Sequence, residues 1–125
     1  WYGIQTPEHQ AFLKAYEAKF KDYPRLGSIV GYNAIQSLAA GIKKANSTDT
    51  EKLIAAFKGL PVNTPWGTIT YRAQDNQSTM GAFVGKTTYS QKMQRGIMTD
   101  FYYADGKDYQ PSDEAVKKLR PASAQ

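Results

Sequence analysis

The hydrophobic pattern of this chain changes its period near residue 60. Before that point apolar residues recur every three or four positions, the spacing that places them on one face of an α-helix. From residue 66 onward apolar and polar residues alternate, as they do in half-buried β-strands. The sequence therefore predicts an α/β chain with a helical first half and a β-rich second half, and its 125 residues suffice for one domain.

The first helix is expected over residues 7–22. Thr6 can accept a hydrogen bond as its N-cap, and Pro7 suits the first helical position, where a backbone N–H is not needed. Pro24 stops the helix, because proline disfavours helical geometry at the residue before it. An aromatic stripe with helical spacing predicts the face that enters the core: Phe12, Tyr16, Phe20 and Tyr23.

A short strand and two further helices are expected next. The apolar segment GSIVGY (27–32) has the composition of a short buried strand, and the period then predicts helices over 32–45 and 49–58. Thr48 and Glu51 have the spacing of a capping box for the second of these helices. The longer helix is predicted to bury the stripe formed by Ile35, Leu38, Ala39, Ile42 and Ala45.

The second half is predicted to hold a hairpin, a further strand and a short helix. Residues 66–88 contain two alternating stretches around the turn-forming segment AQDNQST, which indicates a hairpin with a long loop. The segment GIMTDFYYADGKDY supplies another strand, with Asp105 and Gly106 as its turn. Ser112 is the expected N-cap of a final helix over 112–119.

Composition excludes several classes of protein. No segment approaches the roughly 20 apolar residues of a membrane span. The chain has no cysteine, which excludes disulfides and thiol chemistry. Its net charge of +5 comes from lysines and arginines that are spread along the sequence and interrupted by acidic residues. Such scatter is typical of solvated faces and helix ends, so we expect no nucleic-acid partner.

The sequence contains no catalytic or metal-binding constellation. His9 is the single histidine and is expected at the surface, so the chain has neither a histidine pair for zinc nor a base for a Ser-His-Asp triad. The acidic pairs Asp49/Glu51 and Asp113/Glu114 both stand at helix starts, where capping explains them. We therefore expect no enzymatic activity, no metal and no cofactor.

Three segments carry a resemblance to a known family. TPWGTITYRAQDNQSTMGAFVGK resembles the C-terminal block of the periplasmic solute-binding proteins of ABC importers in the branched-chain amino acid and amide family. That block has a Thr-Pro-Trp-Gly entrance, a strand ending in Tyr-Arg, an Asp-x-Gln turn and a Gly-x-x-Val-Gly-Lys strand. The preceding segment, from FLKAYEAKF to FKGL, is similar to the family's order of helix, short strand, helix and helix. DFYYADGKDYQPSDEAVKKLRP resembles the usual ending.

The resemblance implies a type I periplasmic-binding fold, in which two α/β lobes are joined by three chain crossings and close on a solute. This chain would be the C-terminal part of such a fold. Residues 1–66 would belong to the first lobe, and residues 67–125 would run back past the hinge to complete the second. Trp66 and Gly67 would lie on the hinge side.

The same resemblance implies that Gly27, Ser28 and Tyr32 lie nearest the solute, because the short strand before the Tyr-x-Ala helix points into the cleft in this family. The alternative, in which Gly27 forms a turn and Tyr32 starts a helix, remains open. Asn33 stands where many members carry Asp, which removes a charge from this point.

The function implied is periplasmic capture of a small amino acid, amide or aromatic acid and its delivery to an inner-membrane ABC permease. A ligand-sensing domain of a receptor or amidase-type regulator with the same fold is the alternative. Because the cleft needs both lobes, we expect this chain alone to bind solute poorly. Because little covers its apolar stripes, we also expect it to pair with a second copy or with the remainder of a parent chain.

Overall fold

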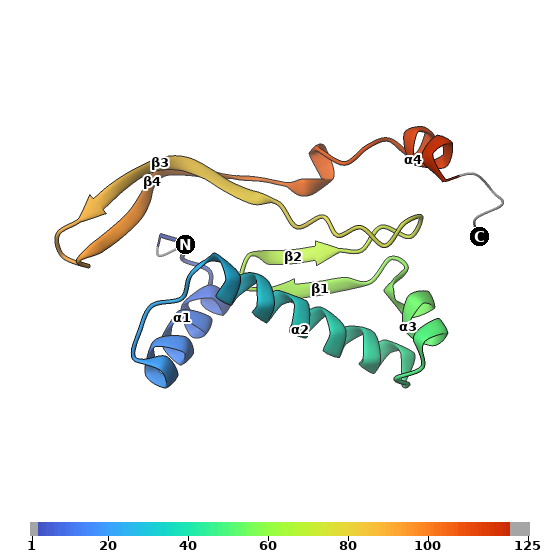
Figure 1. Cartoon of the computed structure of the whole chain (residues 1–125), viewed down its shortest axis with the longest axis horizontal. Coiled ribbons are helices and arrows are strands. Elements are labelled where there is room, and N and C mark those ends of the chain that lie inside the picture. Colours follow the sequence, from blue (N-terminus) through green and yellow to red (C-terminus); the bar gives the residue numbers. More distant parts are fainter. Residues whose placement is uncertain (1–2, 121–125) are drawn as a thin grey trace.

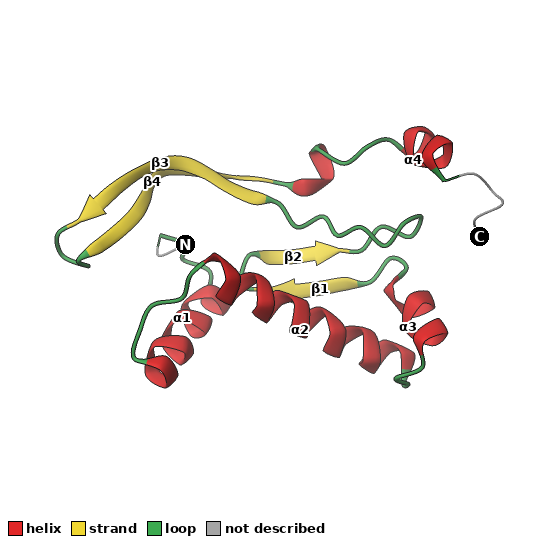
Figure 2. Cartoon of the chain, viewed as in Figure 1, coloured by secondary structure: helices red, strands yellow, loops and turns green. Residues whose placement is uncertain are grey.

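The computed structural model describes residues 3–120 of the chain, and the helices lie mainly in the first half (Figures 1 and 2). In chain order the elements are α1 (Pro7–Phe20), α2 (Leu26–Ala45), α3 (Thr50–Phe57), β1 (Pro61–Thr64), β2 (Gly67–Thr70), β3 (Ala82–Ser90), β4 (Arg95–Ala104), the 3₁₀ helix η1 (Gly106–Asp108) and α4 (Asp113–Leu119). The predicted α/β character, with a β-rich second half and a short final helix, is confirmed.

Helix α1 begins as the sequence predicts. Thr6 Oγ1 accepts a hydrogen bond from the His9 N–H at 3.3 Å, and Pro7 occupies the first turn. The helix ends at Phe20, two residues before the expected end, because Lys21 adopts a left-handed conformation with φ 54°. Thr6 also donates to the carbonyl of Pro65 at 3.2 Å, which ties the start of α1 to a turn far along the chain.

The strand predicted at residues 27–32 is wrong, because this segment forms the first turns of α2. The helix begins at Leu26, and Ser28 Oγ accepts from the backbone N–H of Arg25 at 3.2 Å, which caps the helix start. A short apolar run suits a buried strand only where neighbouring strands pair with it. Both sheets among the described residues consist of other segments.

The predicted buried stripe of α2 is also wrong. Ile35 is 67% exposed and Leu38 is 43% exposed. The buried face consists instead of residues spaced four apart: Ile29, Asn33, Ser37 and Gly41. This face packs against β1 and α3, and its small residues let those elements come close. An ideal Cβ on Gly41 would lie 2.6 Å from the Phe57 ring, for example.

Helix α3 starts one residue later than the capping-box interpretation placed it. Asp49, not Thr48, is the N-cap, and its carboxylate accepts from the Lys52 N–H at 3.0 Å. Gly59 leaves the helix with a φ of 68°, a conformation that glycine adopts without strain. The chain then enters β1.

Strand β1 was not predicted, and its presence changes the pairing of the sheet. It pairs antiparallel with β2, from Pro61 opposite Thr70 to Thr64 opposite Gly67. The hairpin predicted over residues 66–88 is therefore wrong, because β2 folds back on β1 and leaves β3 to pair with β4. Closing a two-residue turn orders less chain than closing the long loop that was predicted.

Hydrogen bonds of the Thr64 side chain stabilise the β1–β2 turn. Thr64 Oγ1 donates to the Gly67 carbonyl at 2.8 Å and accepts from the Trp66 N–H at 3.2 Å. Gly67 has a φ of 103°, which other residues rarely adopt. The hairpin contributes Val62 and Ile69 to a small core with Leu60, and Ala40 and Phe57 pack against it.

Strands β3 and β4 form a long antiparallel hairpin that is separate from the β1–β2 pair, and its turn end lies on the side of α1 (Figure 1), where Arg95 pairs with Glu17 at 3.4 Å. A register shift between Val84 and Lys86 bends it. The predicted further strand is confirmed as β4, and the Asp105–Gly106 turn leads into η1. Ser112 caps α4 as expected, by accepting from the Ala115 N–H at 3.2 Å.

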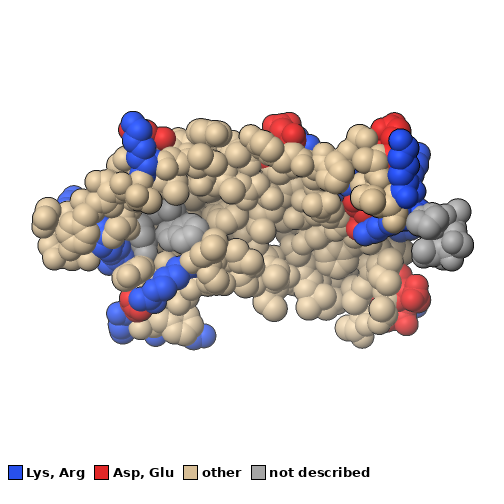
Figure 3. Space-filling view, turned by 45° about the horizontal axis from the view of Figure 1, so that its top comes forward, with Lys and Arg blue, Asp and Glu red and all other residues tan. Residues whose placement is uncertain are grey.

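Two properties of the described residues bear on function. No helix within residues 3–120 is long and apolar enough to cross a membrane. Figure 3 shows lysine and arginine side chains in small separate groups, most of them near the two ends of one face, with acidic residues beside several of them and a further acidic group at the upper edge of the middle. This face carries no continuous basic stripe.

Candidate functional site

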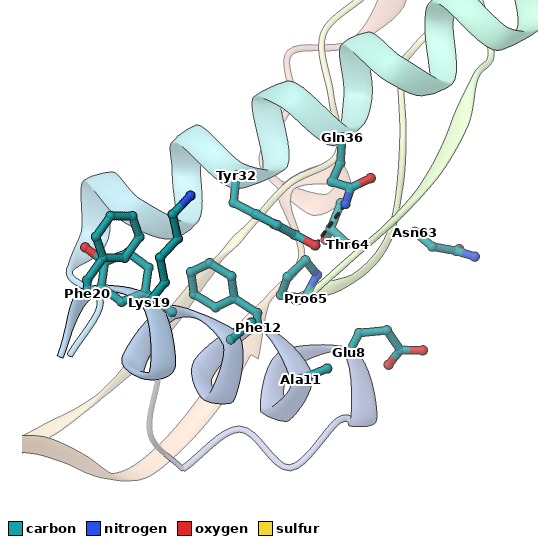
Figure 4. Close-up of a pocket in the computed structure, with 12 residues that line it drawn as sticks. Glu8, Ala11, Phe12, Lys19, Phe20, Tyr32, Gln36, Asn63, Thr64 and Pro65 are labelled. Carbon is teal, nitrogen blue, oxygen red and sulfur yellow. Dashed lines mark hydrogen bonds between the residues drawn. The ribbon is translucent and has the colours of Figure 1, made fainter. Parts of the chain in front are cut away.

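A groove of about 610 Å³ lies between α1, α2 and the β1–β2 turn (Figure 4). Three parts of the chain line it, namely one face of α1, one turn of α2 and the end of β1 with the following proline. The lining residues are Glu8, Ala11, Phe12, Ala15, Tyr16, Lys19, Phe20, Tyr32, Gln36, Asn63, Thr64 and Pro65. Its volume and mainly apolar lining are those of a small-molecule site.

Aromatic rings form most of one end of the groove. Phe12, Tyr16 and Phe20 lie one helical turn apart on α1, so their rings follow one another along the helix in tilted contact, with centroids 5.9 and 4.5 Å apart. Tyr32 reaches across from α2 and places its ring centroid 4.9 Å from that of Phe12. The aromatic stripe that the sequence assigned to the core is therefore shared between core and groove, since Phe12 is buried while Phe20 is 55% exposed.

Hydrogen bonds hold the two tyrosines. Tyr32 Oη accepts from Gln36 Nε2 at 2.9 Å, which joins neighbouring turns of α2. Tyr16 Oη accepts from Ser28 Oγ at 3.1 Å. Because Ser28 also caps the start of α2, one side chain orients both the helix and a wall of the groove.

The groove has one basic and one acidic lining residue, at opposite ends. Lys19 Nζ lies 5.4 Å from the ring centroid of Phe20, beside the aromatic end. Glu8 lines the groove at the start of α1. Eleven residues separate the two, which corresponds to roughly 16 Å along a helix axis.

The structure separates the three residues proposed as nearest the solute. Tyr32 lines the groove. Ser28 does not line it but holds Tyr16, which does. Gly27 is exposed on α2, and a Cβ added there would meet nothing within 4 Å. Solute contact by these residues stays a prediction.

Of the pair expected on the hinge side, Trp66 lies in the β1–β2 turn and Gly67 begins β2. Trp66 packs against the cluster of Phe12, Leu13 and Ile29. Its ring also meets that of Phe83 on β3 edge to face, with centroids 5.8 Å apart. The pair thus joins the helical part to the β3–β4 hairpin, and a hinge role stays a prediction.

Sequence reasoning missed Lys19, Gln36 and Pro65 as lining residues. Gln36 lies one turn after Tyr32 on the same helix, a spacing that could have identified it. The positions of Lys19 and Pro65 depend on how α1 packs against α2 and the β1–β2 turn, and no local pattern carries that information.

The prediction that His9 lies at the surface is wrong, because the residue is fully buried. Positions 9, 12 and 13 share one face of α1, and all three are buried. The ring centroid of His9 lies 6.2 Å from that of Phe12. In residues 3–120 no three His, Cys, Asp or Glu side chains lie close enough to hold a metal ion.

The Asp-x-Gln turn of the second half has a structural explanation. Arg72 forms a two-pronged ion pair with Asp75, and hydrogen bonding by this guanidinium lowers the pKa of Asp75 to about 2. Asp75 also accepts from the Gln77 N–H at 3.1 Å. Arg72 donates to the Pro111 carbonyl at 2.7 Å, so the loop is tied to the start of α4.

A family model and a curated relative that match this chain both describe binding proteins. A family model described as periplasmic binding protein matches residues 1–93. Over 65 residues the chain is 32% identical to a leucine-, isoleucine-, valine-, threonine- and alanine-binding protein of Pseudomonas aeruginosa, covering 52% of this chain and 17% of the relative.

Two solved structures share the fold. One is an ABC-type branched-chain amino acid transporter from Rhodopseudomonas palustris CGA009, with a TM-score of 0.75 and 24% identity over 86% of this chain and 29% of the other. The second is a solute binding protein of an ABC transporter from Rhodopseudomonas palustris BisB5, in complex with 3,4-dihydroxy benzoic acid, with a TM-score of 0.71 and 22% identity over 82% of this chain and 28% of the other. The chain therefore spans less than a third of these proteins.

Proposed function

We propose, because the chain belongs to the periplasmic binding protein family, that it forms part of the solute-binding component of an ABC importer. The observation that carries this proposal is the groove between α1 and α2, which combines an apolar lining with a few polar groups at its ends. The relatives and neighbours are named as binding proteins and transporter components, which supports reversible binding without turnover.

The solute class that we propose is a small amino acid, amide or aromatic acid. The Pseudomonas aeruginosa relative is named for amino acids, and one structural neighbour holds a dihydroxybenzoic acid. Delivery to a membrane permease and a periplasmic location belong to the same proposal.

The division into lobes is also a proposal. The boundary proposed between residues 66 and 67 falls at the β1–β2 turn, where the Trp66 ring meets Phe83 of β3. Because Ile69 of β2 packs with Leu60 and Val62, β2 remains with the helical part, and we place the passage to the second lobe after it. No side chain of β3 or β4 is fully buried, which supports a location of this hairpin in a different lobe from α1, α2 and α3. The exposed face of α2 around Ile35 and Leu38 would pack against a part of the two-lobed protein that this chain does not include.

A titration followed by ¹⁵N NMR tests the proposed site, since it detects the weak binding expected of a partial cleft. We expect a panel of amino acids, amides and aromatic acids to contain solutes that shift the amides of Tyr32 and Gln36. Tyr32→Ala should remove these shifts. The matched variant Tyr102→Ala, on the β3–β4 hairpin, should keep them. A panel that leaves the groove unshifted, or that shifts only the hairpin, contradicts the proposal.

A further inference from the structure

The proposed solute site can be narrowed to one class of solute, and this step rests on the proposed function. The amide nitrogen of Gln36 can only donate, so Tyr32 Oη accepts in that bond and keeps its own O–H hydrogen for another partner. With the Lys19 ammonium, the groove offers two donor groups, one at the aromatic end and one on the side of Gln36.

The aromatic side chains that line the aromatic end of the groove favour a solute with a flat ring. Phe12, Phe20 and Tyr32 present ring faces and edges around one end of the groove (Figure 4). Phe20 and Tyr32 are 55% and 41% exposed, so part of this aromatic surface is open to a solute. Aromatic pairs gain from offset-stacked or edge-to-face contact beyond the area that they bury.

The positions of the charged side chains that line the groove on α1 disfavour a zwitterionic solute. An α-amino acid carries its ammonium and carboxylate groups on the same carbon atom. Glu8 and Lys19 stand roughly 16 Å apart along α1, so one such solute cannot reach both. At the aromatic end the charged group is Lys19, which favours a solute with a single negative charge.

We propose that this groove selects a planar aromatic carboxylate. The ring packs among Phe12, Phe20 and Tyr32, and the carboxylate pairs with the Lys19 ammonium. Figure 4 shows the Tyr32 hydroxyl directed toward Gln36 and away from Lys19, so its O–H donates to an acceptor on the far end of the ring. A benzoate with an oxygen substituent opposite the carboxylate satisfies both ends.

Four probes separate the contributions of the aromatic ring, the single negative charge and the zwitterion. Benzoate is compared with benzamide, which lacks the charge, with cyclohexanecarboxylate, which lacks the aromatic ring, and with leucine, which is zwitterionic. We expect benzoate to bind about 2- to 10-fold more tightly than cyclohexanecarboxylate. Benzoate should bind up to about 5-fold more tightly than benzamide, and leucine should be the weakest. Dissociation constants are measured by ¹⁵N NMR titration of the whole chain.

Variants assign these preferences to residues. Lys19→Gln should remove the advantage of benzoate over benzamide, whereas Lys14→Gln, on the same helix but outside the groove lining, should preserve it. Tyr32→Phe should weaken 4-hydroxybenzoate more than benzoate. The bond from Gln36 is lost for both solutes, whereas the donor to the ring substituent is lost only for 4-hydroxybenzoate. Circular dichroism verifies that each variant keeps its helices.

The outcomes distinguish this inference from the proposed function. Leucine binding in the groove without a preference for benzoate overturns the aromatic carboxylate and leaves the solute-binding function in place. Equal losses in Lys19→Gln and Lys14→Gln overturn the role of Lys19. An unshifted groove with all four probes contradicts both proposals.

Discussion

The helical part with the β1–β2 hairpin and the longer β3–β4 hairpin bury their apolar side chains to different extents. In the first region Ile29, Val62 and Ile69 are between 1% and 4% exposed. In the second, Val84 is 45% exposed and Tyr102 is 59% exposed, although the two lie opposite each other on paired strands. One region has a core, and the other has a hydrogen-bonded ladder with little burial.

This difference indicates where the stability of the chain originates. Burial is the main favourable term in folding, and an isolated two-stranded hairpin is only marginally stable in water. The β3–β4 hairpin meets the rest of the chain through a few contacts: the Trp66 ring meets that of Phe83, and near the hairpin turn Arg95 pairs with Glu17 of α1 at 3.4 Å. The helical region should therefore determine the unfolding transition, while the hairpin is available for contacts in a larger protein.

Truncating one side chain in each region should give the largest difference in the free energy of unfolding. Ile29→Ala removes a side chain from the cluster with Phe12 and Leu13 and should lower the free energy of unfolding by about 3 kcal/mol. Tyr102→Ala on the exposed hairpin should change it by less than about 0.5 kcal/mol. Urea unfolding followed by circular dichroism measures both. Similar effects of the two changes would show that the hairpin belongs to the same cooperative core.

Two glycines on α2 allow its packed face to be compared with its exposed face. A Cβ at Gly41 would lie 2.6 Å from the Phe57 ring, whereas at Gly31 it would meet nothing within 4 Å. Gly31→Ala should stabilise the chain, because alanine favours helix, and Gly41→Ala should destabilise it through overpacking. We expect the variants to differ by about 2 kcal/mol in urea unfolding. A destabilising Gly31→Ala would mean that another molecule covers this face in solution.

The ion pair of Arg72 and Asp75 predicts a pH dependence that the β3–β4 hairpin should lack. Since the pKa of Asp75 falls from 3.8 to about 2 on folding, its contribution is complete above pH 4 and is lost as the pH falls from 4 toward 2. We expect a loss of about 1 kcal/mol, reduced by contact of Arg72 with solvent. Asp75→Asn should flatten this part of the stability curve. Asp100→Asn, at an exposed position on β4, serves as control and should retain the slope.

The smallest effect is expected at an exposed ion pair within the β3–β4 hairpin. Lys86 Nζ lies 3.1 Å from Asp100 Oδ2, and both side chains are mostly exposed. Lys86→Met should lower the free energy of unfolding by less than about 0.5 kcal/mol, and added salt should remove the difference. A larger, salt-insensitive loss in urea unfolding would contradict the view that this hairpin contributes little to stability.

Part of the candidate site could be predicted from the sequence. Tyr32 was expected from the family resemblance, and the spacing of Phe12, Tyr16 and Phe20 follows from helical periodicity. All four side chains line the groove. Lys19 and Pro65 could not be predicted, because they come together only when α1, α2 and the β1–β2 turn pack. The burial of His9 could not be predicted either, because it depends on a neighbouring element that covers this face of α1.

The sequence by itself determined the helix starts at Thr6 and Ser112, the change from helical to strand period and the turn after β4. Caps and periodicity act within a few residues, so no distant contact is needed to specify them. Only the tertiary structure decided that GSIVGY is helical, that β2 pairs with β1, and that α2 buries Asn33 and Ser37 while Ile35 faces outward. These outcomes depend on which surfaces are present to pack against each segment, and hydrophobicity alone does not identify the partner.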